Sequence, residues 1–513
     1  GLNYATAYTF TLAAGSVADL TDNATDQAIV LNFTTKTKPA VTKALYDFIV
    51  PTDGDFKAAL AAAAKRTDTS KRFRIFIKQG DYKIPADEKS KVTGSDGKSY
   101  ANPTTYMDTP NVSIIGESMD NTSLTNTVPN SGQSANVLEG IGKGDVLCLQ
   151  KGATNTYFQD LKMYSSMGDA KGRDIILNDQ SNKTICKNVN LWAYQDTYVS
   201  NNQNGKFYFE DGILRGRTDY LCGKGDVYYN NVELWICEKG GYLAVPSQPK
   251  KYGYIFKDCT IKDATAAKDL NGNYTLGRPW GKGTPIALYI NTKMEAIPSA
   301  AGWNEMSGGY PKRFAEYNSY TSTGSIVDLK DRKKVYDAYD SKDGDNYVNR
   351  RNETAGNPIL TAEEAAAYTI ETVMGQDDDW DPTAATEQAS APSNVKLNGT
   401  TLAWDNNDYA LLWAVCKNGK VVDFTIKPTY LVDDASATWS VRAANEMGGL
   451  SEATAAVLGT GIRNIASATD AAAIKTAIYA ADGTQLSNLK KGINIIVKTL
   501  ADGSKKTSKV IVK

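Results

Sequence analysis

The 513-residue sequence predicts an all-β protein, with a right-handed parallel β-helix followed by small β-sandwich modules. Two observations predict the parallel β-helix. From Val112 onward, short strand-like segments carry an aromatic residue or cysteine, then any residue, then Asp or Asn, and usually an apolar residue. The Asp or Asn positions recur every 20 to 28 residues, in the segments 158–161, 186–189, 209–212, 229–232 and 256–259. One strand signature per repeat at this period is typical of a solenoid, and apolar alternation within each strand favours a narrow core.

Composition limits the chemistry. The chain has 57 Lys plus Arg and 58 Asp plus Glu, a net charge of −1, which gives no reason to expect a nucleic-acid partner. No stretch approaches the roughly 20 apolar residues of a membrane-spanning helix. Histidine is absent, which excludes Ser-His-Asp and Cys-His mechanisms and any zinc site that needs histidine. A hydrolase of this composition must move protons with carboxylates or a lysine. The six cysteines form no Cys-x-x-Cys pair, so we expect buried, free thiols.

The first elements follow from local signals. Asp55 precedes an amphipathic helix whose apolar face is Phe56, Ala59, Leu60 and Ala63, and this helix is a candidate N-terminal cap of the coil. A strand is expected at 73–77, and the polar insert at 85–105 is expected to be a loop. The charged run from 330 to 351 is expected to be a solvated excursion, and a short helix is expected at 361–365.

These signals divide the chain into five parts. The parts are an N-terminal segment without an assigned role (1–40), the β-helix domain (41–383), a linker rich in small residues (384–392), a β-sandwich module (393–458) and a final small β module (462–513). In the sandwich, alternating apolar residues such as Leu402 and Trp404 are separated by turns. In the last module, Asp482-Gly483 and Asp502-Gly503 predict hairpin turns.

Two aspartates in the middle of the repeat point to chemistry. Asp196 and Asp219 are 23 residues apart, close to the period of the coil, so they are expected to stack on adjacent turns. Adjacent strands lie about 4.7–4.9 Å apart. Two carboxylates this close in a half-dry groove do not both ionise easily, so the pKa of one rises. Such a pair can supply an acid and a nucleophile.

Three motifs around these aspartates resemble the signature set of the pectin methylesterase family. They are Gln195-Asp196-Thr197, Asp219 followed four residues later by Gly223, and Leu276-Gly277-Arg278-Pro279-Trp280. Gly80-Asp81-Tyr82 and Ile114-Ile115-Gly116-Glu117 are weaker similarities. The resemblance covers about residues 45 to 380, keeps the order of the motifs, and implies a right-handed parallel β-helix.

The resemblance implies a role for each residue. Asp219 is the nucleophile that attacks the methyl ester, and Asp196 is the acid that protonates methanol and then the base that activates water. Gln195 donates to the oxyanion, and Arg278 holds Asp219 ionised. Trp280, Arg173, Tyr220 and Tyr198 are the candidate substrate-binding residues. The implied substrate is pectin, a methylated homogalacturonan, and no metal or organic cofactor is implied.

Two positions depart from the family pattern. Arg173 stands where the family has a second oxyanion glutamine, and it could donate to the oxyanion, bind a galacturonate carboxylate or remain solvated. Cys222 replaces an aromatic residue of the groove. Its expected role is packing, because no histidine is present to activate the thiol.

The C-terminal modules carry two further resemblances. The sandwich resembles a fibronectin type III module through Trp404 and the segment 439–448. The last module resembles the C-terminal sorting domains of proteins exported by Bacteroidetes-type secretion, through Ile478-Tyr479, Gly492-Ile493 and the terminal residues 509–513. Together they imply a secreted or surface-exposed protein, associated with the outer membrane, and a monomer is expected.

Three alternative functions stay open from the sequence. A pectate lyase should show a calcium-binding carboxylate cluster, and none is evident near 195–280; a polygalacturonase should show more clustered carboxylates. A binding-only protein is favoured by Arg173 and Cys222, and opposed by Asp196, Asp219 and Arg278. An esterase for a different polymer or acyl group also remains open.

Overall fold

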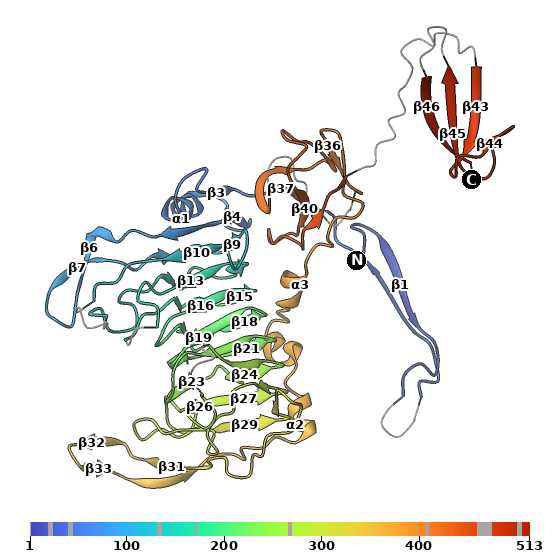
Figure 1. Cartoon of the computed structure of the whole chain (residues 1–513). Helices are drawn as coiled ribbons and strands as arrows, with labels where there is room; N and C mark the ends of the chain where they lie inside the picture. Colours follow the sequence, from blue (N-terminus) through green and yellow to red (C-terminus); the bar gives the residue numbers. More distant parts are fainter. Residues whose placement is uncertain are drawn as a thin grey trace.

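A computed structural model describes residues 2–18, 24–38, 45–130, 136–169, 172–264, 269–406, 410–458, 475–499 and 505–512. Three parallel sheets run side by side along a coil, which confirms the expected parallel β-helix (Figure 1). Each turn of the coil passes once through each sheet. The sheets contain ten, nine and seven strands, and we name them by these numbers.

The strands of the three sheets are as follows. The ten-stranded sheet contains β3 (Phe48–Val50), β4 (Phe73–Ile77), β9 (Val112–Gly116), β12 (Tyr157–Gln159), β15 (Thr184–Lys187), β18 (Lys206–Glu210), β21 (Asp226–Asn230), β24 (Tyr254–Lys257), β27 (Ile286–Ile290) and β29 (Arg313–Tyr317). The nine-stranded sheet contains β5 (Gly80–Lys83), β10 (Thr122–Thr125), β13 (Lys162–Tyr164), β16 (Asn190–Trp192), β19 (Ile213–Gly216), β22 (Glu233–Ile236), β25 (Thr260–Asp263), β28 (Lys293–Met294) and β30 (Tyr320–Thr321). The seven-stranded sheet contains β8 (Tyr106–Met107), β11 (Leu147–Leu149), β14 (Leu177–Asp179), β17 (Tyr198–Ser200), β20 (Thr218–Gly223), β23 (Gly241–Pro246) and β26 (Tyr274–Gly277).

The recurring Asp or Asn lies at the corner between the ten-stranded and nine-stranded sheets. Asp160, Asn188, Asp211, Asn231 and Asp258 all have positive φ, between 49° and 56°. Asp and Asn tolerate this left-handed conformation better than other residues that carry a side chain. Neighbouring corners are also bonded: the Asn188 amide donates to Asp160 at 2.6 Å, and the Asn231 amide donates to Asp211 at 2.7 Å. The sequence repeat therefore marks the corner of each turn.

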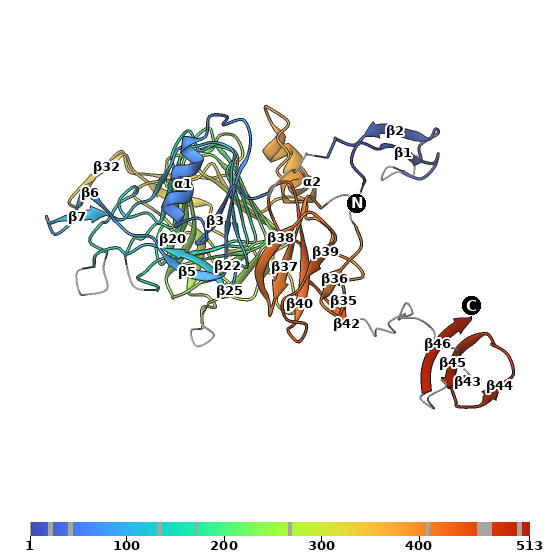
Figure 2. The ribbon, with the colours of Figure 1, turned by 90° about the horizontal axis from the view of Figure 1, so that it is seen from above.

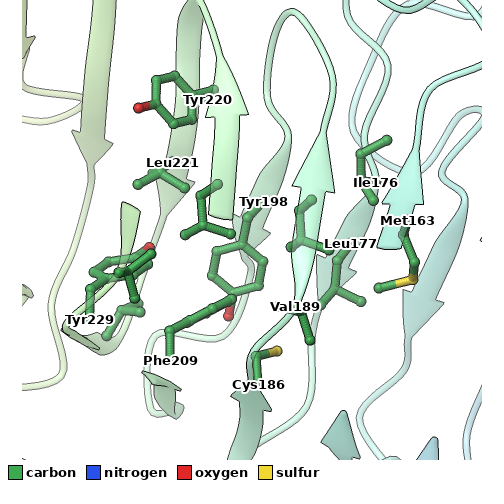
Figure 3. Close-up of a cluster of buried hydrophobic side chains, with 14 of the residues drawn as sticks. Met163, Ile176, Leu177, Cys186, Val189, Tyr198, Phe209, Tyr220, Leu221 and Tyr229 are labelled. Carbon is green, nitrogen blue, oxygen red and sulfur yellow. The ribbon is translucent and has the colours of Figure 1, made fainter. Parts of the chain in front are cut away.

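The interior of the coil is apolar and aromatic (Figure 3). Phe209, Tyr229, Phe256 and Tyr289 stack in one column, with ring centroids 5.2, 4.6 and 4.3 Å apart. Stacked rings at this spacing add attraction beyond the burial of their surface. The six cysteines are buried and free, as expected.

Helix α1 (Phe56–Lys65) lies at the N-terminal end of the coil. The Asp55 carboxylate accepts the Ala58 N–H at 2.8 Å, which caps the first turn. The predicted apolar face of Phe56, Ala59, Leu60 and Ala63 is buried, so the helix prediction is confirmed. The loop prediction for 85–105 is wrong, because strands β6 (Asp87–Thr93) and β7 (Ser99–Asn102) form an antiparallel hairpin there.

The charged run at 330–351, near the C-terminal end of the coil, contributes to an antiparallel arm. Strands β31 (Val335–Ala338) and β34 (Arg351–Thr354) pair antiparallel, and β32 (Ser341–Asp343) pairs with β33 (Asn346–Val348). Figure 1 shows this arm and the β6–β7 hairpin projecting from the same side of the coil. The predicted short helix is α2 (Ala362–Ala366), with a capping box between Thr361 and Glu364. The π-helix η1 (Glu371–Gly375) and α3 (Thr383–Thr386) follow.

The sandwich consists of two four-stranded sheets. One contains β35 (Lys396–Asn398), β36 (Thr401–Ala403), β39 (Thr429–Leu431) and β42 (Val457–Leu458), and the other contains β37 (Leu412–Lys417), β38 (Lys420–Thr425), β40 (Trp439–Ala444) and β41 (Thr454–Ala455). Its core is built around Trp404, Trp413 and Trp439. Two sheets packed face to face agree with the sandwich expected from alternation.

The sandwich packs directly on the ten-stranded sheet. Phe424 contacts the rings of Tyr46 and Phe76, at centroid distances of 4.9 and 5.2 Å. The buried Glu117 carboxylate accepts the Val421 N–H at 2.6 Å. The predicted linker is also held, because the Gln159 side chain donates to Gln388 at 2.8 Å. The module is therefore fixed to the coil and is not loosely tethered.

Two further units lie outside these bodies. Strands β1 (Ala7–Leu12) and β2 (Ile29–Thr34) pair antiparallel in the N-terminal segment. The last module is one four-stranded antiparallel sheet of β43 (Lys475–Ala480), β44 (Gln485–Leu486), β45 (Gly492–Thr499) and β46 (Lys505–Val512). The Asp482-Gly483 turn joins β43 to β44, as predicted; the Asp502-Gly503 turn lies outside the described residues. None of the helices in the described ranges is both long and apolar enough to cross a bilayer.

Candidate active site

The two aspartates lie on adjacent turns of the coil. Strand β17 pairs with β20 at an offset of 23 residues, and an isolated bridge joins Gln195 to Thr218 in the same register. Asp196 and Asp219 therefore occupy equivalent positions on neighbouring turns, as expected from their spacing. Both have positive φ, 56° and 51°. This is the same left-handed conformation that the Asp and Asn residues adopt at the corners of the coil.

Arg278 holds the Asp219 carboxylate. It follows β26, two turns further along the coil. Its Nε donates to Oδ1 of Asp219 at 2.9 Å, and its Nη2 donates to Oδ2 at 2.6 Å. The guanidinium also lies 3.9 Å above the ring of Tyr242. A bidentate pair of this kind fixes the orientation of the carboxylate. The pairing expected for these two residues is present.

Asp196 has a different environment. The residue is only 4% exposed, and its carboxylate accepts a hydrogen bond from Nε of Arg173. The pKa of Asp196 is raised to about 6, mainly by burial and also by the nearby charge of Asp219, although the charge of Arg173 and hydrogen bonds from Arg173 and Cys222 lower it. One carboxylate is therefore clamped by an arginine, and its neighbour keeps its proton to a higher pH than an ordinary aspartate does.

Arg173 is ordered by the same register. Parallel bridges join Arg173 to Gln195 and Gln195 to Thr218, so these three residues stack on successive turns. The Arg173 side chain is 35% exposed, yet its guanidinium forms an ion pair with Asp196. The solvated alternative for Arg173 therefore does not describe this structure. Gln195 is half-buried in this column, next in sequence to Asp196.

Trp280 lies on the exposed surface near the arginine clamp. It is 38% exposed, and its backbone N–H donates to the carbonyl of Pro246 at 3.0 Å. A fixed, half-open indole two residues after Arg278 agrees with the expectation of a sugar-binding face. Contact with a substrate stays a prediction.

The prediction that Tyr198 and Tyr220 bind substrate is wrong. Both are 0% exposed and belong to the interior core (Figure 3). The ring of Tyr198 packs edge-on against Phe209 at 4.8 Å. Tyr198 occupies an inward position opposite the buried Leu221 of the next turn, and Tyr220 is buried beside Leu221 in the same core. They support the coil from inside and cannot contact a polymer in the groove.

The sequence did not predict that outward-facing residues of β17 and β20 form a cluster near the candidate site. Val199 and Cys222 belong to a small apolar cluster outside the coil that also contains Ile175 and Val245, against which Ile141, Tyr242 and Met306 pack. Burial raises the pKa of the Cys222 thiol well above its usual value, which agrees with a packing role. Strict alternation from Tyr198 would have identified Val199 as an outward residue.

The site combines three features. It has a carboxylate held by Arg278, a buried acid whose pKa is raised to about 6, and the half-buried Gln195 next in sequence to that acid. Among the described residues, no group of three or more Cys, Asp or Glu is arranged to hold a metal ion. A fixed nucleophile next to a proton donor is the arrangement needed for acyl transfer through a covalent intermediate.

Comparison with known proteins gives one family. The family model described as Pectinesterase matches residues 47–351. A pectinesterase/pectinesterase inhibitor of Solanum lycopersicum is 23% identical over 56% of this chain and 47% of its own length. A probable pectinesterase of Aspergillus oryzae is 29% identical over 31% of this chain and 48% of its own length. The chain thus spans about half the length of the curated relatives it matches.

Solved structures of two pectin methylesterases align with part of this chain. A pectin methylesterase from carrot aligns over 69% of this chain and 99% of its own, with 17% identity and a TM-score of 0.49. A pectin methylesterase from Erwinia chrysanthemi aligns over 67% of this chain and 99% of its own, with 21% identity and a TM-score of 0.47.

Proposed function

The chain belongs to the pectinesterase family, and from this premise we propose that it is a carboxylic ester hydrolase that removes methyl esters from pectin and releases methanol. The observation that carries the proposal is the pairing of Asp196 and Asp219 on adjacent turns, each with its own arginine. The two carboxylates have different protonation tendencies, so that one can attack while the other donates a proton.

The first step forms an acyl-enzyme. The Asp219 carboxylate attacks the ester carbonyl, and the carbonyl oxygen gains negative charge that the Gln195 amide stabilises. The bond from carbon to the methoxy oxygen then breaks, and Asp196 transfers its proton to that oxygen to give methanol. One well-placed oxyanion donor contributes about 3–4 kcal/mol in chemistry of this kind.

The second step releases the acid product. Asp196, now ionised, takes a proton from water, and the water oxygen attacks the acyl carbon. The bond to Asp219 breaks, which regenerates its carboxylate and leaves galacturonate. Splitting the hydrolysis in this way replaces one high barrier by two lower ones.

Arg173 has a defined place in this scheme. Its guanidinium contacts the acid that loses a proton in the first step, so it stabilises the Asp196 anion that results. It also orients the carboxylate toward its neighbour. This role differs from that of a glutamine, which carries no charge.

The surroundings of the site complete the proposal. Trp280 offers an exposed indole to a sugar ring. Residues 393–458 are proposed to be a fibronectin type III-like module, and 462–513 a sorting-type module of a secreted or cell-surface protein. The sandwich described above and the sheet of β43–β46 support these proposals, which match a polymer too large to enter a cell.

Methanol release from highly methylated pectin, with and without a chelator, tests the function. We expect release that the chelator does not affect, because no step uses a metal. Replacing Asp219 with Ala should abolish release and leave the thermal transition intact, and an active Asp219→Ala variant would refute the mechanism. If the wild type binds pectin but releases no methanol, a binding-only function is favoured, with Arg173 holding Asp196 permanently ionised.

A further inference from the structure

The outward face of the nine-stranded sheet carries a column of aromatic and cationic side chains. Strand pairing places one outward residue of each turn beside the next, in the order Tyr164, Trp192, Arg215, Trp235 and Lys262. Successive turns are about 4.8 Å apart. Three aromatic rings and two cations therefore share one column at regular spacing, on a surface that the candidate active site does not use.

The rings hold the cations in place. The Lys162 ammonium lies 5.0 Å from the ring centroid of Tyr164 and 4.5 Å from that of Trp192. The Arg215 guanidinium lies 4.3 Å from the Trp192 ring. Cation–π contacts at these distances orient the charges without neutralising them.

The charge of Lys162 has no matching carboxylate. Arg215 forms an ion pair with Asp169, and Lys262 forms one with Glu233 at 2.6 Å. Lys162 forms no ion pair with any residue that the structure describes. The acidic groups that act on it are Asp81 and Asp120.

Asp81 is already engaged elsewhere. Its carboxylate accepts hydrogen bonds from Tyr164 at 2.8 Å and from Ser123 at 2.6 Å. Partial burial and the neighbouring Arg215 lower the pKa of Lys162. A partly buried ammonium beside a second cation is a favourable position for an external anion.

This face adjoins the candidate active site. Trp192 is three residues before Gln195, and Arg215 is four residues before Asp219. A chain extends by at most about 3.6 Å per residue, so each pair of Cα atoms is within roughly 11 to 14 Å. Figure 2 shows the strands of this sheet (β5, β22, β25) and β20 on adjoining faces of the coil. A polymer bound at the candidate active site can therefore extend onto the outward face of the nine-stranded sheet.

We propose that Lys162, Trp192 and Arg215 form an accessory binding site for a de-esterified stretch of a uronate polysaccharide. The Lys162 ammonium binds a uronate carboxylate, Arg215 keeps its ion pair with Asp169 beside it, and Trp235, with its N–H bonded to Glu233 at 2.8 Å, offers a ring to the sugars. The anion site follows from the charges alone, whereas the choice of a uronate polymer rests on the proposed function.

The proposal predicts which form of the polymer binds. A methyl ester is neutral, and each ester removed creates one carboxylate. The accessory site should therefore hold the product stretch more tightly than the methylated stretch, and keep the polymer attached beside the groove.

Titration calorimetry with polygalacturonate tests the proposal. Replacing Lys162 with Gln removes the charge and keeps most of the stem, and affinity should fall about fivefold, the effect of losing roughly 1 kcal/mol. Lys293→Gln is the matched control. Lys293 lies in the outward column of Lys162, five strands further along, but is paired with Glu295 at 2.9 Å. Its replacement should leave affinity within twofold.

Other probes identify the ligand class. Fully methylated pectin and neutral galactan should bind more weakly than polygalacturonate, and polyglutamate, which has carboxylates but no sugar rings, should also bind more weakly. Unchanged polygalacturonate affinity in Lys162→Gln would overturn the site, and equal affinity for polyglutamate would overturn the uronate assignment. A chain that releases no methanol but loses polygalacturonate affinity with Lys162→Gln would reject the proposed function and keep this inference.

Discussion

Replacing Arg173 with Gln should move the alkaline limb of the pH–rate profile to higher pH. Arg173 is the cation that contacts the Asp196 carboxylate, and Asp196 must be protonated when the acyl-enzyme forms. The variant loses the charge but keeps a side chain that can donate a hydrogen bond. Asp196 then remains buried beside Asp219 without a neighbouring cation, so its pKa rises.

The size of the shift follows from the geometry. Two unit charges about 4 Å apart interact by roughly 4 kcal/mol at an effective dielectric constant of 20. The Arg173 side chain is 35% exposed, so solvent screening reduces this to about 1.5–3 kcal/mol. One pKa unit corresponds to about 1.4 kcal/mol. The pKa of Asp196, about 6 in the native site, should therefore rise by about 1–2 units in the variant.

The assay is kcat/KM for methanol release between pH 4 and 10. The active form has Asp219 ionised and Asp196 protonated, so activity falls above the pKa of Asp196. The alkaline limb should move up by about 1–2 units in Arg173→Gln and stay within half a unit in Arg173→Lys, which keeps the charge. An alkaline limb that stays in place, or moves to lower pH, would refute the assignment of Asp196 as the proton donor.

Three further predictions concern binding and stability. Trp280→Ala should raise KM for pectin about five- to tenfold with little change in kcat, since it removes a stacking face worth roughly 1 kcal/mol; an unchanged KM would place the sugar elsewhere. Burial raises the pKa of Asp174 to about 7, so its contribution to stability is full below pH 4 and is lost as pH rises through 7. Asp174→Asn, which resembles the protonated acid, should therefore raise the melting temperature at pH 8 and not at pH 4; the opposite order would contradict the shift. Glu117→Ala removes the acceptor of the Val421 and Gln79 N–H groups and should cost about 1–3 kcal/mol, measured by denaturant unfolding, if the sandwich and coil unfold together.

Much of the site could be predicted because its residues are coupled to a local repeat. The 23-residue spacing of Asp196 and Asp219 matches one turn, and the Asp or Asn of each corner marks that turn directly in the sequence. The clamp between Arg278 and Asp219 was expected from the motifs and is present. Helix α1 was predictable for a similar reason, since its cap and apolar face lie within a few residues of one another.

Tyr198 and Tyr220 show where the sequence was insufficient. Both closely follow an aspartate of the candidate site and are aromatic, so they resembled substrate-binding residues. Which face of a strand a side chain occupies depends on how the strand enters the sheet, and here the positive φ of the aspartates turns the chain just before it. The side chains of the two tyrosines lie inside the coil, whereas the smaller Val199 and Cys222 face outward.

The sequence alone therefore determined the period of the coil, the pairing of two carboxylates on adjacent turns, and the order of the modules. All three depend on residues that repeat or lie close together in the chain. Only the tertiary structure decided that Arg173 contacts Asp196 and that the sandwich packs on the coil through Phe424 and Glu117. Only the tertiary structure decided, too, that Lys162 forms no ion pair with a carboxylate in the part of the chain that the structure describes. These outcomes depend on distance between side chains from different turns or modules, which no local pattern encodes.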